Sequence, residues 1–188
     1  AVEGLEARVH LAGFADPDRA RAEALAEGVP GALVTDDFRE LLPDVDAVVL
    51  ALPHDVHREV GLACLEAGKH VLMEKPLALN RRECLDLVAA DRSPDPVLML
   101  GYVMRHHPLW QQMGRFIREK TFGDVFHVSI WTEQLTEAVA KPWLGQADRL
   151  GGGQLFSHGC HYIDLLLHWM GDPVSGTHVG TNRGTPWM

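Results

Sequence analysis

The sequence predicts an α/β fold with a mainly parallel sheet, followed by a second region of different pattern. Over the first part of the chain, short apolar runs alternate with helical segments of about 10–14 residues, which is typical of βαβ units. After about Tyr102 this alternation stops, and longer segments with other patterns follow. We therefore expect a boundary near residues 102–106, with one domain over 1–102 and another over 103–188.

The first region contains the repeated units. Its expected strands cover residues 8–15, 45–52, 70–73 and 97–101, and its expected helices cover 18–27, 36–42, 54–67 and 80–91. Val45–Leu52 and His70–Met73 are continuous apolar runs, as in strands that are buried on both faces of a sheet. Gly28 and Gly68 end helices as C-caps, and Asn80 begins one as an N-cap.

The second region mixes helices with isolated strands. Its expected elements are helices over 109–119 and 158–170 and strands over 124–134 and 176–181. The first helix places Leu109, Met113, Phe116 and Ile117 on one face. The segment 124–134 has only partial apolar alternation, which favours a strand with one solvent-facing side.

Composition excludes several classes of protein. The chain has 188 residues and a formal net charge of −9, with 26 acidic and 17 basic side chains, which argues against non-specific nucleic-acid binding. Its apolar runs are too short to cross a bilayer. Three dispersed cysteines fit a reducing compartment better than a disulfide framework. We therefore expect a cytoplasmic protein that binds neither membrane nor nucleic acid.

Asp16 follows the first predicted strand and precedes a helix. In dinucleotide-binding folds, an acidic side chain at this place accepts hydrogen bonds from the adenosine ribose and repels a 2′-phosphate, which favours NAD over NADP. The alternative is that Asp16 only caps the helix.

Polar residues also follow the next two strands. His54 and His57 come after Leu52-Pro53, where they could form a cofactor wall or an ordinary strand-to-helix turn. Lys75 lies in Glu74-Lys75-Pro76 after the 70–73 strand, and Pro76 could follow a cis bond. In a confined pocket, desolvation would disfavour the charged form of such a lysine and let it share its proton with a substrate hydroxyl; otherwise it is a solvated surface residue.

The densest polar segment runs from Gly151 to Asp164. Three successive glycines permit a close approach of backbone to ligand. Ser157, His161, Asp164 and His168 are spaced i, i+4, i+7 and i+11, and would form one polar stripe on an otherwise apolar helix. His161 is the natural acid–base group of this stripe. The spacing matches no zinc pattern and no Gly-x-Ser-x-Gly elbow, so we expect no metal site and no serine hydrolase.

Four segments in this order resemble the glucose–fructose oxidoreductase/inositol dehydrogenase (Gfo/Idh/MocA) family of NAD(P)-dependent oxidoreductases. The segments are Asp46–His57, Ala67–Ala78, Gly101–Arg105 and Gly151–Asp164, and the resemblance covers roughly residues 9–180. It implies a Rossmann-type domain, incomplete in this chain, followed by the start of an α+β domain with a mostly antiparallel sheet. It also implies hydride transfer between nicotinamide and a sugar, cyclitol or related polyol.

The resemblance implies roles for particular residues. Lys75 would contact the reacting hydroxyl, and His161 would act as general base. The implied contacts to NAD, with NADP less favoured, come from Asp16, Leu52, Pro53, His54, His57, Glu74 and Lys75. The implied substrate contacts come from Arg105, Ser157 and Asp164.

The chain departs from the family pattern in three ways. The family commonly has Asp where this chain has Ser157, so His161 lacks a carboxylate that would raise its basicity. Leu52 stands where Thr is usual. The Gly-x-Gly-x-x-Gly phosphate loop does not occur, which we interpret as truncation at both ends of a longer enzyme that forms homo-oligomers when full length. Two alternatives stay open: a non-catalytic or cofactor-defective relative that binds a sugar-like ligand or a partner, and an NAD-using glycosidase.

Overall fold

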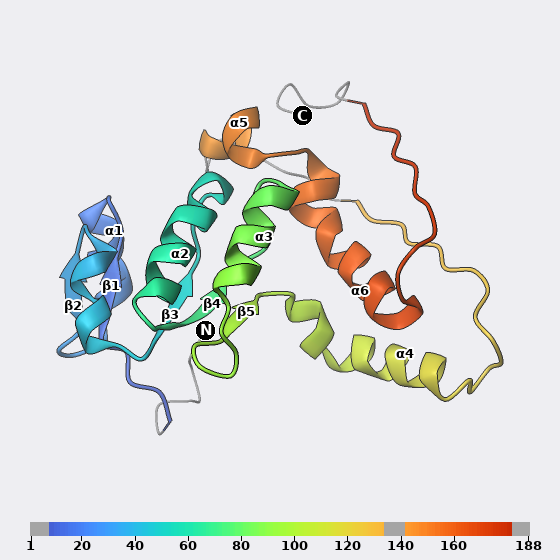
Figure 1. The fold of residues 1–188 in the computed structure, drawn as a ribbon, viewed down its shortest axis with the longest axis horizontal. Helices are drawn as coiled ribbons and strands as arrows, with labels where there is room; N and C mark the ends of the chain where they lie inside the picture. Colours follow the sequence, from blue (N-terminus) through green and yellow to red (C-terminus); the bar gives the residue numbers. More distant parts are fainter. Residues whose placement is uncertain (1–7, 134–141, 182–188) are drawn as a thin grey trace.

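The structure, a computed structural model, describes residues 8–133 and 142–181. The elements form an elongated row (Figure 1). A small unit over residues 13–35 lies at one end, a three-stranded sheet with two helices over residues 47–100 lies in the middle, and two helices over residues 108–118 and 160–170 lie at the other end. No described helix is both long and apolar enough to cross a membrane.

The first unit pairs β1 (Gly13–Ala15) with β2 (Leu33–Thr35) in parallel. Helix α1 (Arg19–Ala26) connects them. Strand β1 is shorter than the predicted 8–15, and β2 was missing from the predicted elements. Three residues are too few to display an apolar period, so only pairing with β1 identifies β2 as a strand.

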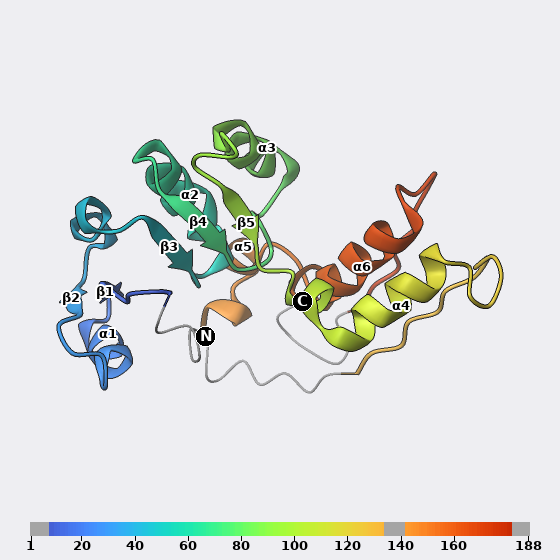
Figure 2. The same ribbon diagram turned by 90° about the horizontal axis from the view of Figure 1, so that it is seen from below.

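The central sheet is parallel, as predicted, in the order β3 (Ala47–Leu50), β4 (His70–Met73), β5 (Leu98–Leu100). Helices α2 (His57–Glu66) and α3 (Arg81–Ala90) make the crossovers and lie on the same side of the sheet (Figure 2). Side chains of β3, β4, α2, α3 and the loop after β4 form the core: Leu50, Cys64, Leu65, Val71, Met73, Ala78 and Leu87. Leu98 and Leu100 of β5 are partly buried and pack against it.

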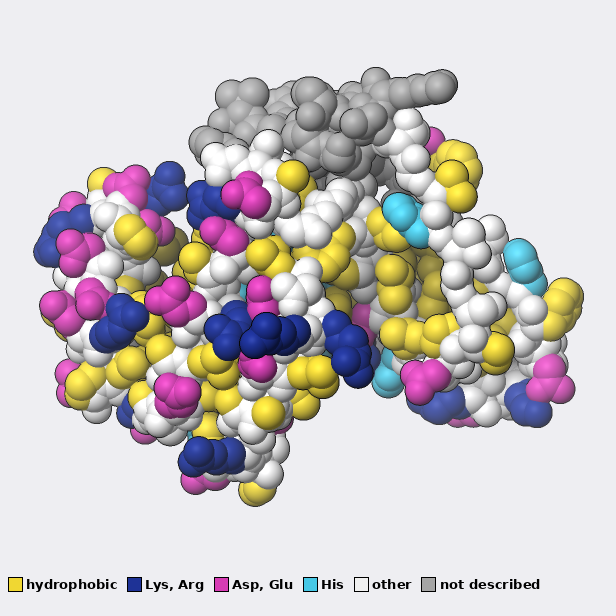
Figure 3. Space-filling model, turned by 45° about the horizontal axis from the view of Figure 1, so that its top comes forward, with side chains coloured by type: hydrophobic (Ala, Val, Ile, Leu, Met, Phe, Trp, Pro, Cys, Tyr) yellow, Lys and Arg dark blue, Asp and Glu magenta, His cyan; other side chains and the backbone are white. Residues whose placement is uncertain are grey.

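The prediction that β3 and β4 are buried on both faces is wrong, and β5 is open in the same way. Val49 is 64% exposed, Leu72 38% and Met99 46%. The reason is that α2 and α3 cover only one face of the sheet in the part of the chain that the structure describes. Hydrophobic side chains also reach the surface at several places on the side of the molecule that Figure 3 shows. The predicted helix over 36–42 is also wrong in type, because two 3₁₀ turns, Phe38–Glu40 and Leu42–Asp44, replace it, and the second contains Pro43.

The second region contributes three α-helices within the described residues: α4 (Pro108–Arg118), α5 (Ala147–Leu150) and α6 (Cys160–Met170). Helices α4 and α6 lie side by side (Figures 1 and 2). A π-helical turn, Leu155–Gly159, leads into α6, so the helical segment starts earlier than the predicted 158.

The strands predicted over 124–134 and 176–181 are wrong for the residues that the structure describes. Residues 124–133 and 176–181 are extended chain without strand pairing, and residue 134 lies outside the described ranges. Phe126 is 97% exposed and Trp131 is 87% exposed. A strand needs a neighbour for its backbone N–H and C=O groups, and no described segment pairs with these two.

Candidate active site

Lys75 joins the two regions of the chain. Strand β4 ends at Met73, so Glu74 and Lys75 lie at the carboxyl edge of the parallel sheet. The Lys75–Pro76 peptide bond is cis. The Lys75 Nζ donates a hydrogen bond of 2.7 Å to the backbone carbonyl of Ser157, 82 positions further along the chain. This bond places the predicted catalytic lysine against the turn that leads into α6.

The glycines before α6 allow neighbouring segments of the chain to pack closely against each other. Gly151 has φ +79°, and a Cβ there would lie 2.5 Å from Cδ2 of Leu79. A Cβ on Gly152 would lie 2.6 Å from Cβ of Phe156 in the π-helical turn. These glycines therefore let the chain turn tightly beside the loop that carries Lys75. The sequence predicted that a ligand would approach this backbone closely, and in the structure the side chains of Leu79 and Phe156 do so.

His161 lies at the start of α6 and is 9% exposed. Its Nδ1 is buried and has no hydrogen-bond partner among the described residues. Burial lowers the pKa of His161, and the positive charge of Lys75 lowers it further. The ring of Tyr102 lies 6.0 Å away between centroids, and burial raises the pKa of Tyr102 to about 12. His161 is thus poised as a neutral imidazole that can accept a proton.

The predicted substrate residues Arg105 and Asp164 form a bidentate ion pair. Arg105 donates from Nε at 2.7 Å and from Nη2 at 2.6 Å, one bond to each carboxylate oxygen. The Asp164 side chain is only 8% exposed, and the hydrogen bonds to it raise the pKa of Arg105. The structure therefore brings the two residues together and ties the Asp164 carboxylate to Arg105. Substrate contact by either residue stays a prediction.

His54 connects the end of β3 to the segment around α5. Its Nδ1 lies 2.9 Å from the carbonyl oxygen of Leu150, and its ring stands edge-on to Trp143 at 4.8 Å. Next to it, Asp55 forms an ion pair of 2.9 Å with Arg149. Burial lowers the pKa of His54, which keeps the ring neutral among these neighbours.

His57 is completely buried at the start of α2. Its Nδ1 lies 2.7 Å from the carbonyl oxygen of Pro76, and its Nε2 lies 3.0 Å from the carbonyl oxygen of Leu52. The ring therefore ties the end of β3 to the loop that begins with Lys75. Leu52 and Pro53 are half-buried beside it. That these residues and His54 line a cofactor stays a prediction.

Two carboxylates at strand ends suit the ribose hydroxyls of a dinucleotide. The Asp16 Oδ1 accepts a hydrogen bond of 2.8 Å from the backbone N–H of Asp18, and Asp18 is the N-cap of α1, so the N-cap position predicted for Asp16 is wrong. Glu74 is exposed, and its Oε2 accepts a 3.2 Å bond from the backbone N–H of Lys75. Among the described residues no hydrogen bond reaches the other oxygen of either carboxylate, which leaves that oxygen available to a hydroxyl donor.

The polar stripe predicted on the last helix is present in part. His161 and Asp164 are buried, and His168 is exposed further along α6. Sequence reasoning gave no role to Tyr102, although its place after β5 is the same strand-end signal that indicated Lys75. It also missed the contacts of Arg149, which depend on a residue 94 positions away and leave no local pattern.

Two family descriptions match the chain. Residues 2–102 match "Oxidoreductase family, NAD-binding Rossmann fold" (GFO_IDH_MocA), and residues 110–186 match "GFO/IDH/MocA C-terminal domain". The chain is 32% identical over 157 residues to a trans-1,2-dihydrobenzene-1,2-diol dehydrogenase of Xenopus laevis, covering 80% of this chain and 45% of that protein. It is 40% identical over 116 residues to inositol 2-dehydrogenase 2 of Saccharopolyspora erythraea, covering 60% and 34%.

A solved structure is also similar. The WlbA dehydrogenase of Chromobacterium violaceum, crystallised with NADH and UDP-GlcNAcA, aligns with a TM-score of 0.80 and 30% identity, over 90% of this chain and 50% of that one. The chain thus spans about half the length, or less, of the relatives it matches. The two matched regions meet between residues 102 and 110, near the boundary expected from the sequence pattern.

Proposed function

The chain belongs to the GFO/IDH/MocA oxidoreductase family, and on that premise we propose that it transfers a hydride between nicotinamide and a carbinol carbon of a sugar, cyclitol or related polyol. The observation that carries the proposal is the 2.7 Å bond from Lys75 Nζ to the Ser157 carbonyl, which brings the lysine to the turn that precedes His161. The names of relatives that act on a diol and on inositol support the substrate class.

NAD is the proposed cofactor, with NADP less favoured. Asp16 would bind the adenosine ribose and Glu74 the nicotinamide ribose, because each carboxylate follows a strand and offers an oxygen to a hydroxyl. Leu52 and Pro53 would form part of the wall beside the nicotinamide. When bound, the nicotinamide accepts the hydride in oxidation and donates it in reduction.

Proton transfer in this proposal belongs to two side chains of the chain itself. Lys75 has three N–H donors, and the Ser157 carbonyl accepts one of them. A second can donate to the reacting hydroxyl oxygen and stabilise the negative charge that develops there. Neutral His161 takes the hydroxyl proton during oxidation and returns it during reduction.

Cofactor binding and turnover test the proposal separately. NAD titration of the purified protein, followed by fluorescence, should show saturable binding, and a panel of cyclitols and sugars should show NADH formation with at least one member. Binding without any turnover would favour a non-catalytic relative. Release of aryl alcohol from aryl glycosides only in the presence of NAD would favour a glycosidase instead.

Asp16→Ala is expected to reduce the preference for NAD over NADP by roughly tenfold, equivalent to about 1.4 kcal/mol. The change removes both an acceptor for ribose hydroxyls and the repulsion of a 2′-phosphate. The ratio of kcat/KM for the two cofactors measures it. Asp18→Ala, which removes a carboxylate two residues away in the same turn, is the matched control and should leave the ratio unchanged. An equal shift in both variants would contradict the assignment of Asp16.

Ser157→Asp should raise the pKa of His161, because a nearby carboxylate favours the imidazolium. In the unaltered protein the pKa of His161 is lowered from 6.5, so the neutral base persists below that pH and is lost only at more acidic values. The acidic limb of the pH–rate profile should therefore move to higher pH in the variant. NMR titration of the His161 ring should show a shift in the same direction. Ser157→Asn, equal in size and uncharged, is the control. An unchanged limb would mean that residue 157 does not act on His161.

A further inference from the structure

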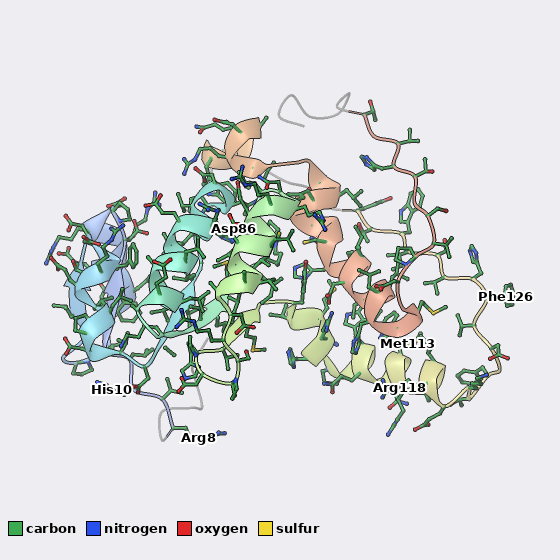
Figure 4. The ribbon with its side chains drawn as sticks, viewed as in Figure 1. Arg8, His10, Asp86, Met113, Arg118 and Phe126 are labelled. Atoms are coloured by element: carbon green, nitrogen blue, oxygen red, sulfur yellow. The ribbon has the colours of Figure 1, made fainter. Side chains whose placement is uncertain are left out.

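A groove runs between α4 and α6, beyond the candidate active site. It has a volume of about 470 Å³, within the ~300–1,000 Å³ typical of pockets for small molecules. Its basic and aromatic lining comes from Arg105, Trp110, Arg115, Arg118, His168 and Trp169. Arg118 lies at the carboxyl end of α4 (Figure 4). The proposed reaction gives no role to these residues of α4 or to His168.

The groove is positively charged, although the chain as a whole is acidic. Neither Arg115 nor Arg118 has an ion-pair partner among the described residues, and neither Asp nor Glu contributes to the groove lining. The carboxylate of Asp164, on α6 beside the groove residue Leu165, already accepts two hydrogen bonds from Arg105. Arg115 donates one bond to Gln112, which leaves most of its five N–H donors available. In a protein of net charge −9, the guanidinium groups of Arg115 and Arg118 thus have no carboxylate partner within the described ranges.

One wall of the groove is aromatic. The rings of Trp110 and Trp169 lie 5.8 Å apart between centroids, at 42° to each other. Trp169 reaches the backbone of α4 because residue 114 is glycine: a Cβ on Gly114 would lie 2.9 Å from the Trp169 Nε1. Flat indole surfaces beside guanidinium groups suit a ligand that has both a ring and an anionic group.

The groove adjoins the proposed reaction centre along α6. His161, Leu165 and His168 lie on one side of this helix, and the last two line the groove. His168 is about 10 Å from His161 along the helix axis, at 1.5 Å per residue. Arg105 lies between the two, bonded to Asp164 and lining the groove. A substrate with its hydroxyl at Lys75 and His161 can therefore extend into the groove.

We propose that the α4–α6 groove is a subsite for a phosphate group carried by the substrate. This inference rests on the proposed oxidoreductase function and narrows its substrate class from any polyol to a phosphorylated one. Guanidinium groups bind phosphate oxygens through paired, charge-assisted hydrogen bonds, and Arg115 and Arg118 are one helical turn apart on α4. A sugar phosphate and a nucleoside diphosphate sugar share this chemistry.

Tryptophan fluorescence provides a test that needs no turnover, because Trp110 and Trp169 line the groove. The protein is titrated with glucose, inorganic phosphate, glucose 6-phosphate and uridine diphosphate. We expect saturable quenching with the phosphorylated probes and none with glucose. Tighter binding of uridine diphosphate than of glucose 6-phosphate would identify a nucleotide as the source of the phosphate, and the reverse order would identify a sugar phosphate.

The double variant Arg115→Gln/Arg118→Gln should weaken binding of the phosphorylated probes at least tenfold, since each lost charge-assisted contact is worth that much. Arg81→Gln/Arg82→Gln is the matched control, because it makes the same charge change at two adjacent exposed arginines of α3. Gly114→Ala, which displaces Trp169, should also weaken binding.

Two outcomes would overturn the subsite: no response of the unaltered protein to any phosphorylated probe, or equal weakening in the Arg115/Arg118 and Arg81/Arg82 variants. Phosphate binding without NAD-dependent turnover would refute the proposed function and leave the subsite standing. Turnover of uncharged polyols without phosphate binding would refute the subsite alone.

Discussion

Replacing Lys75 by methionine is expected to lower kcat for polyol oxidation by roughly 10²–10⁴-fold, the range for loss of one positioned proton donor. Methionine is close in length to lysine and carries no N–H, so the substrate oxygen would lose its cationic partner and Ser157 would lose its 2.7 Å bond. Cofactor affinity should change little, because the proposed ribose contacts come from Asp16 and Glu74. Steady-state kinetics with NAD titration in parallel measure both quantities.

Two further variants make this prediction specific. Lys69→Met alters the lysine just before the start of β4, whereas Lys75 follows its end, and it should leave kcat unchanged. Lys75→Arg keeps a positive charge, so it should hold the Ser157 carbonyl in part and retain more activity than methionine does. Equal losses of kcat and NAD affinity in Lys75→Met would show that Lys75 serves cofactor binding rather than the reacting hydroxyl.

The second large effect is expected at His57. Its ring is 0% exposed and contacts the carbonyl oxygens of Leu52 and Pro76 at 3.0 and 2.7 Å. His57→Leu would remove the ring N–H that one of these carbonyl oxygens accepts, and an unsatisfied buried carbonyl costs about 1–3 kcal/mol. The free energy of unfolding should therefore fall by roughly 1–3 kcal/mol, measured by urea denaturation. Because Pro76 follows Lys75, kcat should fall as well.

His57→Gln and His106→Leu serve as comparisons. Glutamine supplies amide N–H donors and should recover part of the stability lost in the leucine variant. His106 is exposed in the 3₁₀ turn before α4, so its replacement should change stability by less than about 0.5 kcal/mol. A fall of under about 1 kcal/mol for His57→Leu would mean that water or backbone movement satisfies the two carbonyls.

Local patterns predicted the central sheet well. The apolar runs that became β3, β4 and β5 are continuous, and the helix after Asn80 begins where its side chain accepts a bond of 3.1 Å from the backbone N–H of Glu83. Gly68 takes φ +74° after α2, as the expected C-cap does. These features depend on residues that are close in sequence, so the sequence alone indicates them.

Elements that depend on distant neighbours were not predictable in the same way. The three residues of β2 are a strand only because β1 lies beside them, and the alternating segment after Asp124 is not a strand because no described segment pairs with it. The prediction that the second face of β3 is buried was wrong for the same reason. Val49 has the side chain of a core residue, but no described element covers it.

The sequence by itself determined which residue types stand at the carboxyl ends of the strands and along the last helix, and hence the family and the candidate catalytic pair Lys75 and His161. Only the tertiary structure decided how they are held: Lys75 by a carbonyl 82 residues away, Asp164 by Arg105 59 residues away, and the groove by two helices from separate segments. The physical reason is that local residue type sets backbone preference and hydrophobic pattern. Hydrogen bonds and charge pairs between distant residues exist only after packing has brought their atoms within about 3 Å.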